Sequence, residues 1–204
     1  MGMQYKQVGC MNSSPFAEVI ESSLTTWKAQ SWKWSHVPPF GSLVIVHTAD
    51  YKVFGIVYQM RMGSGEQGRT PFPYQKTEAE LLQEHPQIFE FLQTTFDALT
   101  LGFEEDGKIS YQLAQRPPNI HTFVRYATPE EYATFFSQEK YMHVLHNSAH
   151  LVPMDELLLA LLKHRRKYNL LQEKALKNFI ETYSLVTNND YRRLKMFLQR
   201  IEYV

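Results

Sequence analysis

The sequence predicts an α+β protein: a small closed antiparallel β-barrel with a short helical insertion, followed by a C-terminal helical arm or bundle. Short β-branched and aromatic runs bounded by turn residues recur through residues 16–127. A window at about 77–94 has helical spacing instead, and residues 128–204 have a helical pattern throughout. We therefore expect a flexible leader at residues 1–15, the barrel at 16–127 and the helical region after it.

Residues 37–60 form the predicted centre of the barrel. Pro38 and Pro39 exclude a helix at its start, because proline lacks the amide donor that a helix interior needs. Two apolar runs, at residues 43–46 and 53–58, are separated by a short polar link. This arrangement is typical of an antiparallel hairpin.

Alternating apolar and polar residues precede this centre and predict two strands within residues 16–34. In an extended strand Trp32 and Trp34 would share one face, so together with Trp27 they are candidates for an exposed anchor. After the centre, residues 61–76 contain three glycines and two prolines, which predict a loop.

The helical insertion begins with a capping box. Thr77 is followed three residues later by Glu80, a pattern in which two side chains satisfy free amides at a helix start. Pro86 interrupts the helical pattern, so two short pieces are expected. The chain then becomes extended within residues 96–103, and the Asp-Gly pair at 106–107 predicts a tight hairpin. The barrel therefore resumes after the insertion.

A last strand is predicted at residues 120–126, and helices follow it. Thr128 suits the cap of a helix, and Pro129 suits its first position. Three further helical segments are expected, at residues 153–168, 170–185 and 191–203.

Composition restricts the class of protein. Hydrophobic residues make up 44% of the chain and aromatic residues 14%, which excludes a disordered protein. The single cysteine, Cys10, excludes an intramolecular disulfide and a zinc site of several thiolates. No window has the length of a transmembrane helix. We expect no membrane insertion and a cytoplasmic location.

Charge is spread unevenly along the chain, although the formal net charge is zero. Residues 1–150 hold 11 Lys and Arg against 15 Asp and Glu, whereas residues 151–204 hold 10 against 6. Such a tail can form a solvated helix face, or it can contact nucleic acid or an acidic partner. The candidate contact residues are Lys163, Arg165, Arg166, Lys167, Arg192 and Arg193.

No motif in the sequence predicts a reaction. Residues 63–68 match G-x-G-x-x-G, but two prolines follow where a phosphate-binding helix should begin, so a loop explains them better. His143, His146 and His150 have helical spacing, and exposed histidines at a helix end are the simpler interpretation. We expect no metal, no cofactor and no enzymatic activity.

Several short motifs resemble one known barrel. The motifs are EVIESS at residues 18–23, PPFGSLV at 38–44, FGIVY at 54–58, PQIF at 86–89, LGF at 101–103 and RPPNIH at 116–121. They resemble the HerA/ATP-synthase (HAS) barrel, especially stand-alone HAS-barrel proteins of the type found in cyanobacteria and some other bacteria. In larger relatives this barrel precedes an ATPase domain and helps to assemble a ring or to dock a partner. The resemblance therefore implies an adaptor without its own ATPase domain, and it assigns no catalytic residue.

Three hypotheses follow from the sequence. The first is a non-enzymatic protein-interaction or assembly module that binds a protein partner or another copy of itself. The second is a nucleic-acid-binding accessory protein that uses the basic C-terminal helices. The third is an enzyme with a cleft between barrel and helices near Arg116, His121 and Arg125.

Overall fold

The computed structural model describes residues 14–66, 68 and 70–201, and it confirms a closed antiparallel β-barrel accompanied by helices. Six strands close the barrel in the order β1-β2-β5-β4-β3-β7, because β2 also pairs with β5 and β7 pairs with β1. A seventh strand, β6, extends the sheet beside β5. The strands are β1 (Ala17–Ser22), β2 (Thr26–Ser31), β3 (Leu43–His47), β4 (Lys52–Ser64), β5 (Leu92–Glu105), β6 (Lys108–Ser110) and β7 (Phe123–Tyr126). Cys10 and most of the predicted leader lie outside the described residues.

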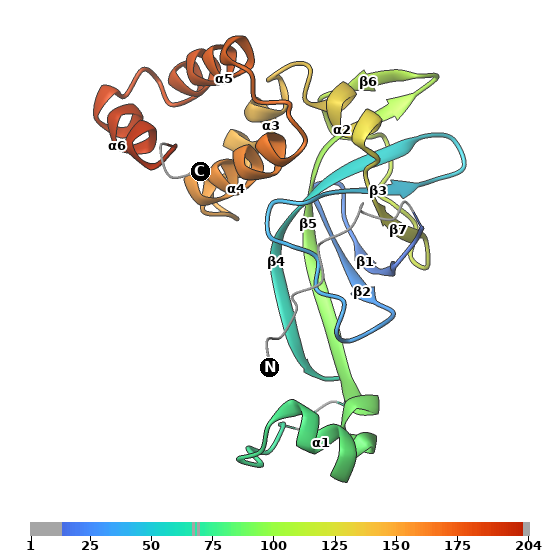
Figure 1. Ribbon diagram of the computed structural model, residues 1–204. Helices are drawn as coiled ribbons and strands as arrows, with labels where there is room; N and C mark the ends of the chain where they lie inside the picture. Colours follow the sequence, from blue (N-terminus) through green and yellow to red (C-terminus); the bar gives the residue numbers. More distant parts are fainter. Residues whose placement is uncertain (1–13, 67, 69, 202–204) are drawn as a thin grey trace.

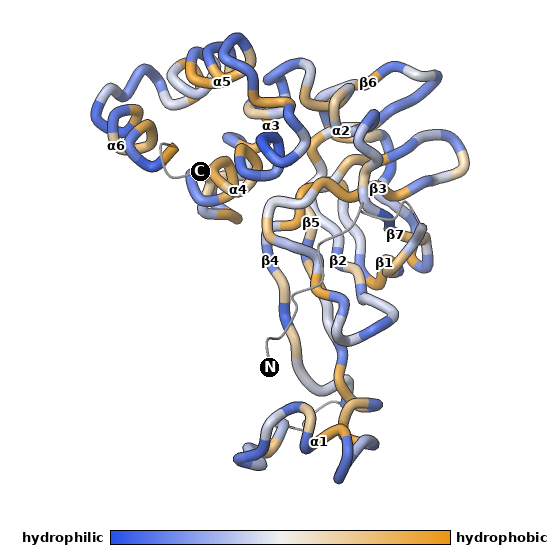
Figure 2. Tube along the Cα trace, viewed as in Figure 1, coloured by the Kyte–Doolittle hydropathy of each residue, from blue (hydrophilic) through white to orange (hydrophobic). Residues whose placement is uncertain are grey.

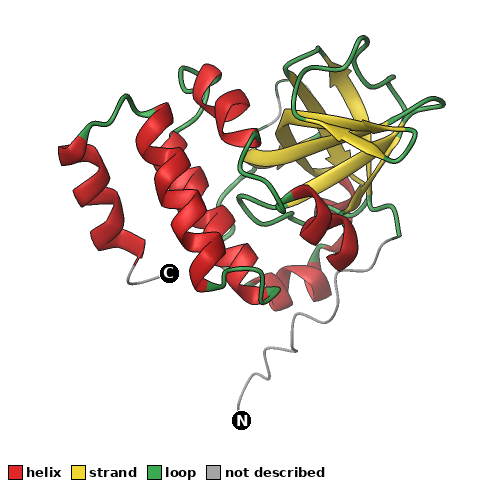
Figure 3. Ribbon diagram, turned by 90° about the horizontal axis from the view of Figure 1, so that it is seen from above, coloured by secondary structure: helices red, strands yellow, loops and turns green. Residues whose placement is uncertain are grey.

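Helices occupy two separate places in the chain. Between β4 and β5 lie α1 (Glu78–Glu84) and the 3-10 helix η1 (Pro86–Phe91). After β7 come α2 (Pro129–Phe135), α3 (Tyr141–Asn147), α4 (Met154–Lys167), α5 (Glu173–Val186) and α6 (Tyr191–Ile201). Figure 1 shows α1 at one end of a long β4–β5 hairpin and the C-terminal helices near its other end, and Figure 3 shows these helices along one side of the barrel.

The barrel interior is apolar and tightly packed. Val44 and Val46 of β3 belong to the same buried cluster as Trp27 and Phe96 from the opposite side of the barrel. Gly55 is needed beside Trp27, because a Cβ at that position would lie 2.5 Å from the Trp27 Cζ2 atom. The alternate residues of β3 must therefore serve a different core.

That second core lies between the outer wall of the barrel and the C-terminal helices. Leu43 and Ile45 of β3 and Phe54 of β4 belong to it, and the Phe54 ring lies 4.6 Å from the ring of Phe135 in α2. Because both faces of β3 are buried, its sequence is a continuous apolar run without alternation. The predicted helical region is thus packed on the barrel.

α4 packs closely against the turn before β3. Gly41 has a φ of +76°, and a Cβ on it would lie 2.8 Å from the Ala160 Cβ. One turn further along α4, a ring nitrogen of His164 hydrogen-bonds the carbonyl oxygen of Phe40 at 3.0 Å. A glycine is required here for its backbone conformation and for space.

Most predicted elements are present, and the main boundary error concerns the β4–β5 hairpin. β4 continues to Ser64, so it takes the first residues of the predicted loop, and β5 starts already at Leu92, inside the predicted helical window. The two strands pair from Lys52↔Glu104 to Ser64↔Leu92. This long ladder of backbone hydrogen bonds outweighs the local glycines and the helical spacing.

The predictions for the tryptophans need correction. β2 ends at Ser31, so Trp32 and Trp34 follow the strand in bends and turns and do not share a sheet face. Trp27 is buried in the barrel and is no exposed anchor. α3 ends at Asn147, and His143 and His150 are exposed, which agrees with the simpler interpretation of histidines at a helix end. Within residues 14–66, 68 and 70–201, no cluster of three His, Cys, Asp or Glu side chains could hold a metal ion.

The helices of the described residues are all too short or too polar to span a bilayer.

Candidate functional site

The six basic residues singled out in the tail do not form one surface. Lys163, Arg166 and Lys167 are exposed at the end of α4, and Arg192 is exposed at the start of α6. Arg193 is half-buried and donates to Asp155 at 2.8 Å. The start and the end of α4 are separated by about 18 Å at 1.5 Å per residue. Arg193 holds the start of α6 beside the start of α4. The exposed cations at the end of α4 therefore lie apart from Arg192 at the start of α6.

Arg165 differs most from its expected place on an exposed face. Only 1% of its surface is exposed, and its Nη1 donates to both carboxylate oxygens of Glu139 at 2.8 and 2.9 Å. The guanidinium also lies over the Phe136 ring, 5.6 Å from its centroid, and donates to the Tyr141 hydroxyl at 3.3 Å. Arg165 therefore joins α4 to the segment between α2 and α3 and is not available to a phosphate.

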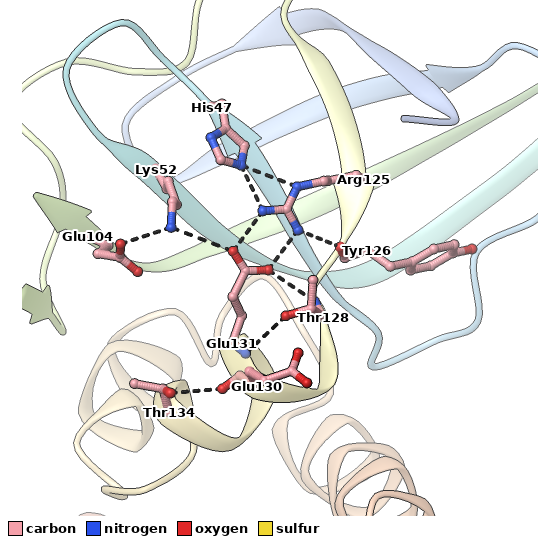
Figure 4. A network of polar contacts seen from close by, with 9 residues as sticks. All are labelled: His47, Lys52, Glu104, Arg125, Tyr126, Thr128, Glu130, Glu131 and Thr134. Carbon is pink, nitrogen blue, oxygen red and sulfur yellow. Dashed lines mark hydrogen bonds and ion pairs between the residues drawn. The ribbon is translucent and has the colours of Figure 1, made fainter. Parts of the chain in front are cut away.

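A network of charged residues joins the barrel to α2 (Figure 4). Arg125 of β7 donates to both carboxylate oxygens of Glu131 at 2.7 Å and to the Nε2 of His47 at 2.8 Å. Arginine can only donate, so His47 accepts at Nε2 and is neutral. Burial, together with the positive charge of Arg125, lowers the pKa of His47.

Glu131 is the centre of this network. It closes the capping box of α2 by accepting from the Thr128 amide at 3.0 Å, and the Nζ of Lys52 lies 3.6 Å away. Burial opposes ionisation of this carboxyl, but hydrogen bonds from Arg125 and the Thr128 amide lower its pKa to about 2. The network acts as a clamp that orients the start of α2 on the barrel wall.

The residues proposed to line an enzymatic cleft do not converge between barrel and helices. Arg125 is engaged in the clamp, His121 pairs with Glu18, and Arg116 contributes its carbonyl oxygen to the Tyr51 hydroxyl at 2.7 Å. The junction itself is filled by the second apolar core. A shallow hollow of about 450 Å³ touches His47, His121 and Arg125, but it lies on the barrel surface beside Phe123.

The end of the β4–β5 hairpin contributes no residue to either apolar core. Beyond the pairing of Ser64 with Leu92, the chain forms a loop, α1 and η1 before it returns. Neither α1 nor η1 contains a buried residue. Figure 1 shows this segment projecting from the barrel, away from the C-terminal helices, and Figure 2 shows hydrophobic positions there beside hydrophilic ones. We call residues 65–91 the tip.

The tip exposes apolar side chains that a folded protein normally covers. Phe72 is 70% exposed, Leu82 is 48% exposed, and Tyr74 and Phe91 exceed one third. Phe72, Tyr74 and Phe91 line a hollow of about 290 Å³, which Leu82 does not line. The hollow is lined by Ser64, Thr70, Pro71, Phe72, Tyr74, Leu81, Ile88, Phe89, Phe91 and Leu92. A contiguous apolar surface with a hollow is typical of a site that binds another protein.

The tip is also acidic. Its sequence holds five Glu against one Lys and one Arg. Glu80 is used in the capping box of α1, and Glu84 pairs with Lys76, whereas Glu78 and Glu90 are exposed at its surface. An apolar hollow with free carboxylates favours a partner surface that is apolar and positively charged.

Sequence reasoning located the tip but did not recognise its surface. The sequence predicts a loop followed by a short helical insertion here, and the structure has a loop followed by α1 and η1, with β4 and β5 extending into both predicted ranges. The available signal was the pair of aromatic residues, Phe72 and Tyr74, within a stretch of glycine and proline. Aromatic residues in such a loop are either buried under it or exposed for binding, and only the fold distinguishes the two.

A scan against protein-family models finds no model that matches this chain. A search of curated proteins likewise finds no match. The resemblance to HAS barrels therefore stays a prediction.

Proposed function

We propose that this protein is a non-enzymatic interaction module, an adaptor built on a HAS-type β-barrel, and that the tip is its binding element. The partner is a protein with an apolar, basic surface. The observation that carries the proposal is the exposure of Phe72, Tyr74 and Phe91 around one hollow on a projecting hairpin. Exposed aromatic side chains around a hollow are the usual anchors of protein interfaces.

The arrangement of the barrel supports this role. A closed barrel leaves few free strand edges, so it can carry a projecting hairpin without offering an edge for aggregation. β4 and β5 pair over their whole length, which holds the tip at a defined distance from the barrel. The clamp around Glu131 and the ion pair of Arg165 stabilise the opposite end, where the helices are packed.

A nucleic-acid role is the second candidate, and three exposed cations support it. Lys163, Arg166 and Lys167 are three and four residues apart near the end of α4, so they share one helix face that could contact phosphates. The same residues also complement the negative end of the α4 dipole, which explains them without a ligand. The Arg166→Glu/Lys167→Glu variant tests this candidate: nucleic-acid binding should weaken, and its dependence on salt should become shallower.

Affinity capture with a matched pair of variants tests the adaptor proposal. The full chain is tagged and captured from a nuclease-treated lysate of its source cells as wild type, Phe72→Lys and Ile120→Lys. Ile120 is 54% exposed in a different part of the molecule, so it controls for a new lysine at an exposed apolar site. We expect proteins that are bound by wild type and by Ile120→Lys and lost with Phe72→Lys.

Two outcomes of this experiment would contradict the proposal. If Phe72→Lys captures the same proteins as wild type, the tip is not the binding element. If wild type captures material from a parallel untreated lysate but none from the nuclease-treated lysate, nucleic-acid binding by the basic end of α4 is favoured over the adaptor role. Phe72 is 70% exposed, so its replacement should leave the fold intact, and a circular dichroism spectrum checks that point.

A further inference from the structure

We propose that the partner of the tip is the outer face of α6 on a second copy of this chain, so that copies join head to tail. This inference rests on the proposed function, because it uses the same tip. It adds the identity of the partner and the symmetry of the assembly. Three properties of α6 lead to it: its exposed side chains, its charge and its position.

The outer face of α6 is apolar and exposed. Its inner face packs through Phe197, which is buried and stacks on Tyr183 of α5 at 4.3 Å. On the outer face, Tyr191 is 75% exposed and Met196 is 59% exposed. A helix with apolar residues on both faces, one of them uncovered, suits insertion into a partner's groove. We call Tyr191, Arg192, Lys195 and Met196 the α6 face.

The charge of the α6 face is opposite to that of the tip. Arg192 and Lys195 are exposed beside Met196, and no ion pair is found for either within the described ranges. The other two arginines of α6 are neutralised, since Arg193 pairs with Asp155 and Arg200 with Glu156. The free carboxylates of the tip, on Glu78 and Glu90, therefore have free cations to meet on α6.

The hollow of the tip also suits a side chain of the α6 face. Its volume of about 290 Å³ can receive one or two large side chains, and its walls include Leu81, Ile88 and Phe89. Met196 is unbranched and flexible, so it can adapt to an irregular apolar hollow and contact aromatic rings favourably.

The two surfaces cannot meet within one chain. In Figure 1 the tip and α6 lie at opposite ends of the molecule, with the barrel between them. A symmetric tip-to-tip pair would instead place like charges together, which is unfavourable. A contact between two different surfaces is heterologous, so it continues from copy to copy as a ring if the rotation closes and as a filament if it does not.

Sedimentation velocity of the purified full chain tests this inference through complementation of two variants. Phe72→Lys breaks the tip, and Met196→Glu breaks the α6 face; both positions are exposed, and each change adds a repelling charge. We expect the apparent mass of wild type to rise above the monomer mass of 24.0 kDa as the protein concentration increases. High salt should reduce this rise, because it screens the charges of both surfaces. Each variant alone should be monomeric.

The mixture of the two variants gives the decisive result. It retains one intact tip and one intact α6 face, so it should form a one-to-one dimer and stop at twice the monomer mass. Ile120→Lys is the control and should assemble like wild type. A wild type that stays monomeric at every concentration, or a mixture that stays monomeric, would overturn the inference.

The result also separates this inference from the proposed function. If the purified chain is monomeric but Phe72→Lys still loses a captured protein, the adaptor role stands and the partner is another protein. If Phe72→Lys behaves as wild type in capture as well as in sedimentation, both proposals are overturned.

Discussion

Helices α1 and α2 begin with the same local signal and end in opposite environments. Each has seven residues, a threonine N-cap and a glutamate at the third position, and each forms a complete capping box. α2 buries Tyr132 and Phe135, whereas no residue of α1 is buried. Local sequence therefore specified that a helix starts, and its surroundings determined what the helix is used for.

The difference comes from the strand that precedes each helix. α2 follows β7 directly, so it starts beside the barrel wall, where Arg125 binds Glu131. α1 follows a strand that has left the barrel, and its Leu81 lines the same hollow as residues of the preceding loop, of η1 and of the ends of β4 and β5. We call the barrel wall and the helices packed on it the packed end. We expect the packed end to account for the stability of the fold and the tip to provide a binding surface. Three comparisons between variants test this division.

The largest effect is expected at the packed end, from Arg165→Met. This change leaves the buried Glu139 carboxylate without its partner, so the free energy of unfolding should fall by about 3–5 kcal/mol. Arg166→Met, one position further along α4 and exposed, should change it by less than about 0.5 kcal/mol. Denaturant unfolding of the two variants measures both values.

The double variant Arg165→Met/Glu139→Gln shows whether the cost arises from the unpaired charge. It should recover part of the lost stability, because no buried charge is then left alone. Equal stabilities of Arg165→Met and Arg166→Met would contradict the assignment of Arg165 to the packed end.

The second-largest effect on the free energy of unfolding is expected from Glu131→Gln, and this effect depends on pH. The pKa of Glu131 falls from its usual 4.5 to about 2 in the fold, so its stabilisation is present above pH 4.5 and is lost as pH falls through about 2. At neutral pH the free energy of unfolding of wild type should exceed that of the variant by about 2–3 kcal/mol. This difference should become smaller as the pH falls. Urea unfolding at several pH values measures it.

Glu80→Gln provides the matched comparison on α1. Glu80 has the same position in its capping box, but it is fully exposed, so the midpoint of urea unfolding should not move. A difference between wild type and Glu131→Gln that stays constant down to pH 2 would show that its carboxylate charge is not the cause.

The smallest effect is expected from the two capping threonines. Thr128→Ala should lower the free energy of global unfolding by about 1 kcal/mol, because α2 belongs to the cooperative core. Thr77→Ala should leave global unfolding unchanged and accelerate amide hydrogen exchange only within α1. If Thr77→Ala lowers global stability as much as Thr128→Ala, the tip is part of the same cooperative unit.

Local interactions explain which features could be predicted from the sequence. The hairpin of β3 and β4, the Asp-Gly turn at 106–107, the capping box at Thr77 and the helix cap at Thr128 depend on neighbouring residues, and all are present. The end of β2 and the length of β4 depend on strands far away in the chain. Those boundaries were accordingly misplaced, together with the faces assigned to Trp32 and Trp34.

The sequence by itself determined the fold class, because periodicity and turn residues reflect interactions within a few positions. Only the tertiary structure decided which charged side chains and which aromatic rings are buried and which are exposed. Arg165 and Arg166 are neighbours of the same type, yet one is buried against Glu139 and the other is exposed. Phe135 and Phe72 are both aromatic, yet one fills a core and the other lies on the tip. Burial depends on which distant segment lies opposite a side chain, and that is a property of the packed chain.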